Sequence, residues 1–74
     1  MTELDARRIG KLVRKIRKEE LSQSQEQFAE GIDRSVRTVS NIERGTVVPT
    51  MDTLIRISQY TGKTILYFFD TSEG

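Results

Sequence analysis

The chain has 74 residues with 12 Lys and Arg against 11 Asp and Glu, so its formal net charge at pH 7 is +1 and does not by itself indicate a nucleic-acid ligand. A chain this short predicts one domain around a small core, spanning 1–74 with its packed part at about 6–69. It contains no Cys and no His, which excludes disulfides and removes the commonest general base and metal ligand, so we expect no enzyme, no cofactor and no metal site.

Neither a membrane span nor a targeting segment is predicted. No apolar run approaches the roughly 18 residues that cross a bilayer, and no signal-peptide pattern precedes the domain. We therefore expect a cytoplasmic protein with no membrane partner.

The first predicted helix runs from about Ala6 to Glu20. Its apolar residues recur at the spacing of an amphipathic helix, and they are Ile9, Leu12, Val13 and Ile16. Basic residues form a stripe on one outer side, namely Arg7, Lys11, Arg14 and Lys18. A solvated face explains such a stripe without any ligand, and we favour that interpretation for Arg7 and Lys11.

Two short helices follow, with a turn between them. Ser24 and Gln27 have the spacing of a capping box at the start of the first, whose apolar residues are Phe28, Ala29 and Ile32. Ser35 can cap the second, whose apolar residues, three apart, are Val36, Val39 and Ile42. Gly45 ends it, so the pattern predicts a helix-turn-helix.

The outer face of the second of these helices carries the side chains that indicate a function. At about 100° per residue, the residues opposite the apolar side are Arg37, Ser40, Asn41 and Arg44, with Val36 on the flank. Arg and Asn are the side chains that bond bidentately to guanine and adenine in the major groove. An ordinary solvated helix surface explains this face about as well, so the residues alone leave both interpretations open.

Two further helices are predicted in the last third of the chain. Thr50, just after Pro49, can cap one that ends at Gly62 and whose inner face is Met51, Leu54, Ile55, Ile57 and Ser58. Thr64 can cap a short final helix over residues 65–69, ILYFF. A strand is the alternative there, because these residues also have high β-propensity.

The run SQEQFAEGIDRSVRTVSNIERG (24–45) resembles the helix-turn-helix of the XRE family, the Cro and phage-repressor type of DNA-binding domain. IGKLVRKIR resembles the family's first helix and PTMDTLIRISQYTGKTILYFF its fourth and fifth, so the similarity covers roughly Ile9 to Phe69. The resemblance implies an all-α, compact five-helix, lambda-repressor-like fold with the helix-turn-helix in helices two and three. A rival start of helix two at Ser22, with Gln25 completing its capping box, is disfavoured because Ser24 keeps the Phe-Ala pair in the family's Leu-Ala position.

The resemblance also implies a DNA site. We expect bases to be read by Arg37, Asn41, Ser40 and Val36. The DNA backbone is expected to be contacted by Gln25, Arg44, Arg34, Arg14, Lys18 and Thr50. In the family, a Gln at the place of Gln25 points toward the phosphates or toward the recognition helix. Arg34 replaces an apolar residue before the cap, which predicts a slightly looser turn, and Arg17 and Glu43 stand where relatives have a partly buried ion pair.

The final apolar run predicts a contact between copies. Leu66 and Tyr67 fall where relatives often carry polar residues, so we expect them to face outward and form a dimer interface. The function implied is a transcriptional regulator, a repressor, that binds a palindromic operator in the major groove of double-stranded DNA as a homodimer. The alternative is an antitoxin-like module whose helix-turn-helix domain also binds a protein partner.

Overall fold

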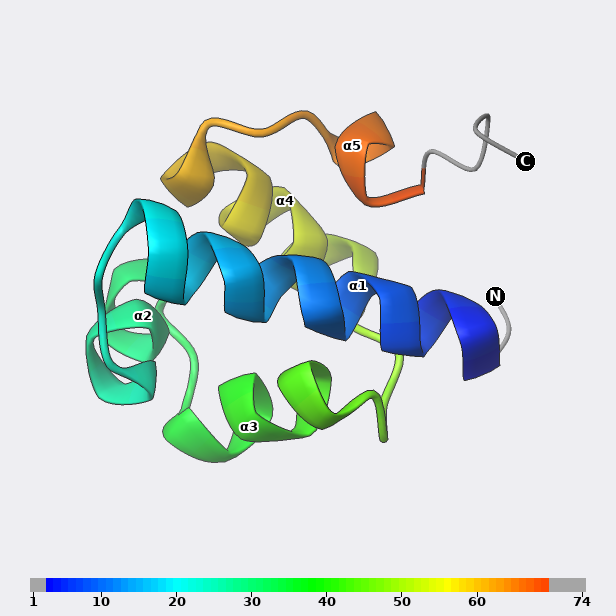
Figure 1. Cartoon of the computed structure of the whole chain (residues 1–74), viewed down its shortest axis with the longest axis horizontal. Helices are drawn as coiled ribbons and strands as arrows, with labels where there is room; N and C mark the ends of the chain where they lie inside the picture. Colours follow the sequence, from blue (N-terminus) through cyan, green and yellow to red (C-terminus); the bar gives the residue numbers. More distant parts are fainter. Residues whose placement is uncertain (1–2, 70–74) are drawn as a thin grey trace.

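The computed structural model of the protein describes residues 3–69, with side chains from Asp5 onward, so the ends of the expected 1–74 domain lie outside the described residues. Its helices are α1 (Glu3–Lys15), the π-helical turn η1 (Ile16–Glu20) that continues it, α2 (Gln25–Ile32), α3 (Val36–Arg44), α4 (Met51–Thr61) and α5 (Ile65–Phe69) (Figure 1). Between residues 3 and 69 there is no strand. The predicted all-α, five-helix fold is therefore confirmed, and the strand alternative for residues 65–69 is wrong.

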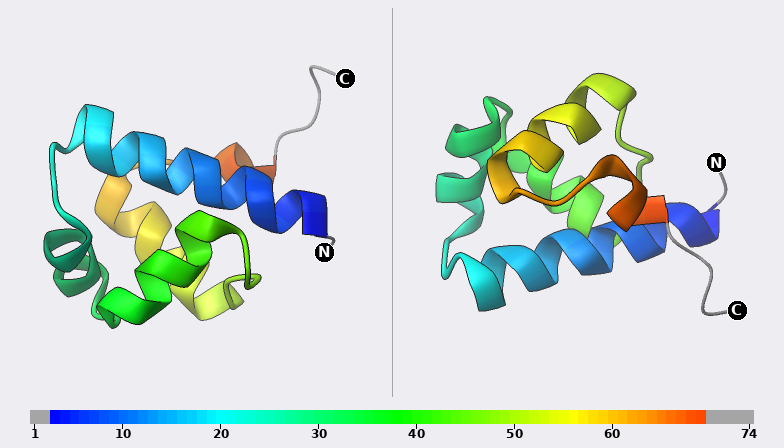
Figure 2. Two further views of the ribbon diagram at one scale, coloured as in Figure 1. Left: turned by 60° about the horizontal axis from the view of Figure 1, so that its bottom comes forward. Right: turned by 90° about the horizontal axis from the view of Figure 1, so that it is seen from above.

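Helix α1 is the element along which the others are arranged. Helix α3 lies along one side of α1, α4 and α5 lie along another, and α2 closes the end at which α1 finishes (Figures 1 and 2). The core draws on all five α-helices, and its residues are Ile9, Val13, Ile16, Phe28, Ala29, Ile32, Val39, Ile42, Leu54, Ile57 and Phe68. Helix α1 thus packs against α3, while α2 packs against α3 and α4.

Side-chain caps define where the helices start. Ser24 Oγ accepts from the Gln27 N–H at 3.1 Å and Gln27 Oε1 accepts from the Ser24 N–H at 2.8 Å, which confirms the capping box and excludes the rival start. Ser35 and Thr50 accept from backbone N–H groups at 3.1 and 3.2 Å. These short polar side chains satisfy donors that the first turn of a helix leaves unpaired. The predicted starts of α2, α3 and α4 are confirmed for that reason.

Gly10 lets α1 and α3 approach each other closely. A Cβ at this position would lie 2.2 Å from the Ile42 carbonyl oxygen and 2.9 Å from that of Glu43, both backbone atoms of α3. The two helices therefore cross with backbone against backbone. This crossing sets how far the outer face of α3 projects from the domain.

The end of α1 departs from regular α-helix geometry. In η1 the Leu21 N–H donates to the Ile16 carbonyl at 3.0 Å, and Ser22 follows with a φ of 54°. Gln23 then makes a hydrogen bond on each side: its carbonyl accepts from Arg17 Nη1, and its Nε2 donates to Tyr60 Oη, both at 2.8 Å. These bonds hold the connection between α1 and α2 against α1 and against α4.

The inner face of α4 is rotated relative to the prediction. Its buried residues are Thr53, Leu54 and Ile57, whereas Met51 and Ile55 are 59% and 41% exposed. Thr53 can be buried because its hydroxyl oxygen accepts from Arg34 Nε at 3.1 Å and bonds to Thr50 Oγ1 at 3.1 Å. The prediction that Met51 and Ile55 belong to the core is wrong, since the polar partners of Thr53 place the opposite flank of the helix inward.

Only part of the final apolar run is exposed. Phe68 is buried, whereas Leu66 is 77% exposed. Tyr67 packs partly buried against the core, edge-to-face on Phe68 with ring centroids 5.4 Å apart, and Lys63 Nζ lies 5.1 Å from its ring centroid. The sequence predicted that Tyr67 faces outward, whereas its side chain is partly buried against the core.

Candidate nucleic-acid interface

Helix α3 lies at the edge of the domain (Figure 1), and its buried residues are Val39 and Ile42, so its outer face is polar. Arg37 and Arg44 are exposed, and Ser40 and Asn41 are partly exposed between them. Val36 is 40% exposed at the start of the same helix. The structure therefore brings together on one helix the residues for which the sequence predicted base reading.

Arg44 and Asn41 are joined to each other on this face. Arg44 Nη2 donates to Asn41 Oδ1 at 2.9 Å. Thr46 closes the end of the helix, because its N–H and its hydroxyl both donate to the Asn41 carbonyl at 3.1 Å. One lone pair of Asn41 Oδ1 and both N–H groups of its amide remain for a ligand. The amide is thus oriented and still able to make three bonds.

Arg17 and Glu43 tie the back of α3 to the end of α1. Arg17 Nε lies 2.6 Å from Glu43 Oε2, and Arg17 Nη2 donates to Glu43 Oε1 at 2.9 Å, with side chains that are 9% and 2% exposed. The hydrogen bond to Glu43 raises the pKa of Arg17, opposed by burial and assisted by the Coulomb attraction of the carboxylate. These are the residues for which the sequence predicted an ion pair.

Gln25, the first residue of α2, joins the same carboxylate. Its Nε2 donates to Glu43 Oε1 at 3.0 Å. The family resemblance implies that Gln25 points either toward the phosphates or toward the recognition helix. In the structure its side chain points toward the recognition helix. Glu43 therefore receives bonds from both η1 and α2, which fixes the orientation of α3 against its two neighbours.

Arg34 differs from its predicted role as a contact to DNA. It forms an ion pair with Asp52 of α4, its Nε donates to Thr53 Oγ1 at 3.1 Å, and its Nη1 donates to the Asp33 carbonyl at 2.8 Å. All three guanidinium nitrogens are thus bonded within the protein. These bonds link the turn to α4, at the place where the sequence predicts a slightly looser turn for lack of an apolar contact.

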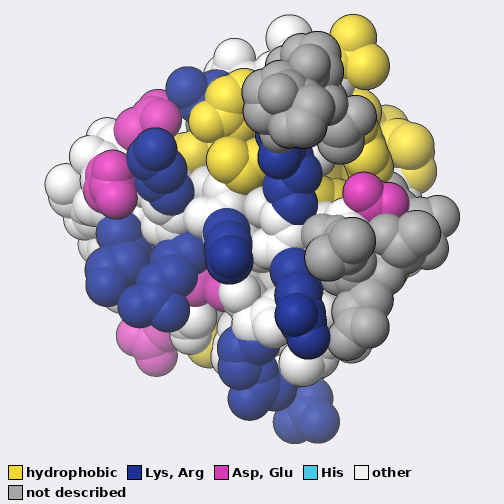
Figure 3. All heavy atoms as spheres, turned by 45° about the vertical axis from the view of Figure 1, so that its right-hand side comes forward, with side chains coloured by type: hydrophobic (Ala, Val, Ile, Leu, Met, Phe, Trp, Pro, Cys, Tyr) yellow, Lys and Arg dark blue, Asp and Glu magenta, His cyan; other side chains and the backbone are white. Residues whose placement is uncertain are grey.

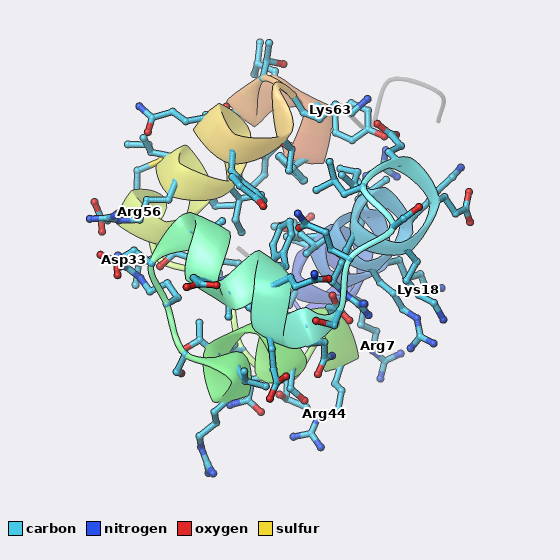
Figure 4. All side chains as sticks on the ribbon, turned by 90° about the vertical axis from the view of Figure 1, so that its left-hand side faces the viewer. Arg7, Lys18, Asp33, Arg44, Arg56 and Lys63 are labelled. Atoms are coloured by element: carbon cyan, nitrogen blue, oxygen red, sulfur yellow. The ribbon has the colours of Figure 1, made fainter. Side chains whose placement is uncertain are left out.

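The other candidates for phosphate contacts lie around α3. Arg14 and Lys18 are exposed on α1 and η1. In Figure 4, Arg7 lies between Lys18, on the right of the view, and Arg44, at the bottom. The Thr50 hydroxyl is used within the protein as the cap of α4. Cationic side chains of α1 therefore flank the recognition helix on one side.

The profile of the helix-turn-helix family matches residues 13–68, which include α2, α3 and the turn between them. The chain belongs to the helix-turn-helix family. This is the XRE or lambda-repressor-like family of DNA-binding regulators, and double-stranded DNA is the ligand that it indicates. Neither a comparison with curated proteins nor one with solved structures found a match. Within the part of the chain that the structure describes, no helix is long and apolar enough to cross a membrane.

Two supports of the helix-turn-helix were missed by sequence reasoning. Gly10 interrupts the apolar pattern of α1, which is a recognised signal of close backbone approach. Tyr60 packs edge-to-face on Phe28 with ring centroids 5.6 Å apart, and its ring lies over Gly31, where a Cβ would be 2.2 Å from Tyr60 Cζ. Nothing local in the sequence distinguishes Tyr60 from any exposed aromatic residue, so its contacts had to be observed.

Proposed function

We propose that this helix-turn-helix protein is a cytoplasmic transcriptional repressor that binds a palindromic operator in double-stranded DNA as a homodimer. The observation that supports the proposal most is the outer face of α3, where Arg37 and Asn41 stand on a helix whose back is fixed through Glu43. Recognition by bidentate bonds requires donors and acceptors held in a constant position. The bonds from Arg17 and Gln25 to Glu43 support a constant position of α3 relative to its neighbours.

Each side chain on the face has a proposed role. Among the described residues, none bonds to the Arg37 guanidinium, so its donors are available for O6 and N7 of a guanine. Asn41 retains the acceptor and donor that adenine requires. Ser40 and Val36 add shorter contacts to base edges, and the apolar Val36 suits a thymine methyl group.

Phosphate contacts are proposed for the cations around α3. Arg44 at the end of the helix and Arg14 and Lys18 on the adjacent side would neutralise backbone charge and set the register of α3 in the groove. Thr50 contributes through the N-terminus of α4, whose free N–H groups favour an anion. Arg34 and Gln25 act indirectly, since their side chains are bonded within the protein.

The homodimer is proposed to form through α5. One domain contacts only a few base pairs, and two recognition helices roughly 34 Å apart in successive major grooves would read a palindrome. Leu66 is 77% exposed, which is the largest exposure among the exposed large hydrophobic residues. A two-fold contact uses one patch twice, so a Leu66 on each copy would be covered by the other.

Leu66 also favours a second candidate function. An antitoxin-like protein would cover the same side chain with a different protein in place of a second copy. Selection of bound sequences from a pool of random duplexes separates the two. Enrichment of a two-fold symmetric site supports the repressor, whereas a lack of enrichment would favour the protein-binding module.

A further inference from the structure

The exposed side of α1 carries more positive charge than the outer face of α3. Four exposed cations of α1 and the adjoining η1 follow one another at i, i+3, i+4 and i+7 and line one shallow hollow together with Glu19. They are Lys11, Arg14, Lys15 and Lys18. The face of α3 offers Arg37 and Arg44, and the loop that follows, TVVP (46–49), has no cation. Figure 3 shows Lys and Arg side chains spread widely over the face of the molecule that it presents. We refer to the four cations of this hollow as the α1 cationic surface.

The α1 cationic surface has no partner within the part of the chain that the structure describes. Three cations elsewhere on the molecule form ion pairs, Arg34 and Arg56 with Asp52, and Lys63 with Glu20. The four cations of α1 have no such anion, although Glu19 lies at the edge of their hollow. Like charges four residues apart on a helix repel each other. An anion bound from outside would relieve this repulsion.

A duplex that lies against α3 cannot contact all four cations of the α1 cationic surface. Gly10 faces the backbone of α3, so it marks the direction of that helix seen from α1. At about 100° per residue, Arg14 lies about 40° from Gly10, Lys11 about 100° and Lys15 about 140°. Arg14 therefore stands beside the recognition helix, whereas Lys15 points away from it and Lys11 lies between.

We propose that the α1 cationic surface is a second, sequence-independent binding site for the phosphate backbone of duplex DNA. In this mode the protein is turned so that α1, in place of α3, faces the duplex. Four cations spread over about 10 Å of helix meet a polyanion with one charge per roughly 1.7 Å of its axis. On DNA that lacks the operator, affinity comes from phosphate contacts, so the orientation that presents most cations is the most stable.

The test uses the whole protein and a random-sequence duplex without any operator. Binding is measured by fluorescence anisotropy between 50 and 200 mM salt, for the wild type and for Lys11→Gln/Lys15→Gln. Each phosphate contact contributes about 0.9 to the slope of log K against log salt, so the loss of two lowers that slope by about 1.8. The double variant Arg56→Gln/Lys63→Gln removes the same net charge away from α1 and should keep the wild-type slope. Circular dichroism verifies that both variants are folded.

A second pair of variants separates the two binding modes. Arg37→Ala should leave affinity for the random duplex within about twofold of the wild type, because α3 reads bases and does not face this duplex. Arg14→Gln/Lys18→Gln should weaken binding to random and operator duplexes alike, since both cations belong to the α1 cationic surface and are also proposed to contact the phosphates of the operator.

Three results would overturn the inference. They are an unchanged slope for Lys11→Gln/Lys15→Gln, an equal loss in the charge-matched control, and a wild-type protein that does not bind the random duplex. The last result would instead point to an acidic protein as the partner of α1. If random duplex binds through α1 but no operator can be selected, this inference stands and the proposed repressor function fails.

Discussion

Glu43 accepts a hydrogen bond from Arg17 of η1 at 2.6 Å and one from Gln25 of α2 at 3.0 Å, so a single carboxylate joins two elements to the back of the recognition helix. The next residue, Arg44, is exposed on the opposite side of α3 and bonds to Asn41 at 2.9 Å. Glu43 thus positions α3, and the adjacent Arg44 lies on its polar face. A change at Glu43 that shifted α3 would move every side chain of that face.

Breaking this ion pair should cost stability. Glu43→Gln and Arg17→Met each leave one partner buried without its counter-charge, and the expected loss is about 3–5 kcal/mol in the free energy of unfolding. The control is Arg14→Met, which removes an exposed cation of the same helix and should change stability by no more than about 0.5 kcal/mol. Urea unfolding measures all three variants. Equal midpoints for Arg17→Met and Arg14→Met would show that the pair does not stabilise the fold.

Gly10→Ala should be more damaging than Gly31→Ala. The new methyl group at residue 10 would lie 2.2 Å from a backbone oxygen of α3, and separating two helices is expected to cost about 1–3 kcal/mol or more. At residue 31 the obstacle is the ring of Tyr60, which is 36% exposed and can move. Thermal unfolding by circular dichroism compares the two. A smaller loss for Gly10→Ala would mean that the α1–α3 crossing adjusts easily.

Arg44→Ala and Asn41→Ala should weaken DNA binding in different ways. Loss of the Arg44 phosphate contact reduces affinity for all sequences and lowers the salt slope by about one unit. Loss of the Asn41 amide should cost about 1–3 kcal/mol at one adenine and relax the preference there. Titrations of an operator and of its single-base variants distinguish these patterns. Uniform weakening by Asn41→Ala would exclude it from base reading.

Leu66→Glu should yield a folded monomer with weaker operator binding and unchanged base preference. Charge on a patch that two copies share opposes association, while the exposed position leaves the core intact. Tyr67→Glu should in addition lower the melting temperature, because Tyr67 packs against the core. Sedimentation velocity with and without a palindromic duplex measures both. A wild-type protein that stays monomeric at high micromolar concentration on that duplex would rule out this interface.

Sequence reasoning succeeded where the signal is local. The helices and their starts follow from apolar periodicity and from caps such as Ser24, whose partner lies three residues away. It failed for Arg34, because the side chain bonds to Asp52, which is 18 residues distant and was not distinguishable from other surface acids. The rotation of α4, with Met51 exposed and Thr53 buried, depends on that same contact. The sequence predicted which residues of α3 form its polar face. The angle at which α3 is held depends on the close approach of Gly10 in α1 to the backbone of α3, and these two helices are distant in sequence.

The measurement that tests the account most directly is the coupling between Arg37 and a single base pair of the selected operator. Wild type and Arg37→Ala are titrated with the operator and with every substitution at the guanine that Arg37 is proposed to read. Arg37→Ala should bind the operator about 1–3 kcal/mol more weakly than the wild type does. Replacing that guanine should not weaken the binding of Arg37→Ala any further. Wild type and Arg37→Ala that respond equally to every base substitution would contradict base reading by α3.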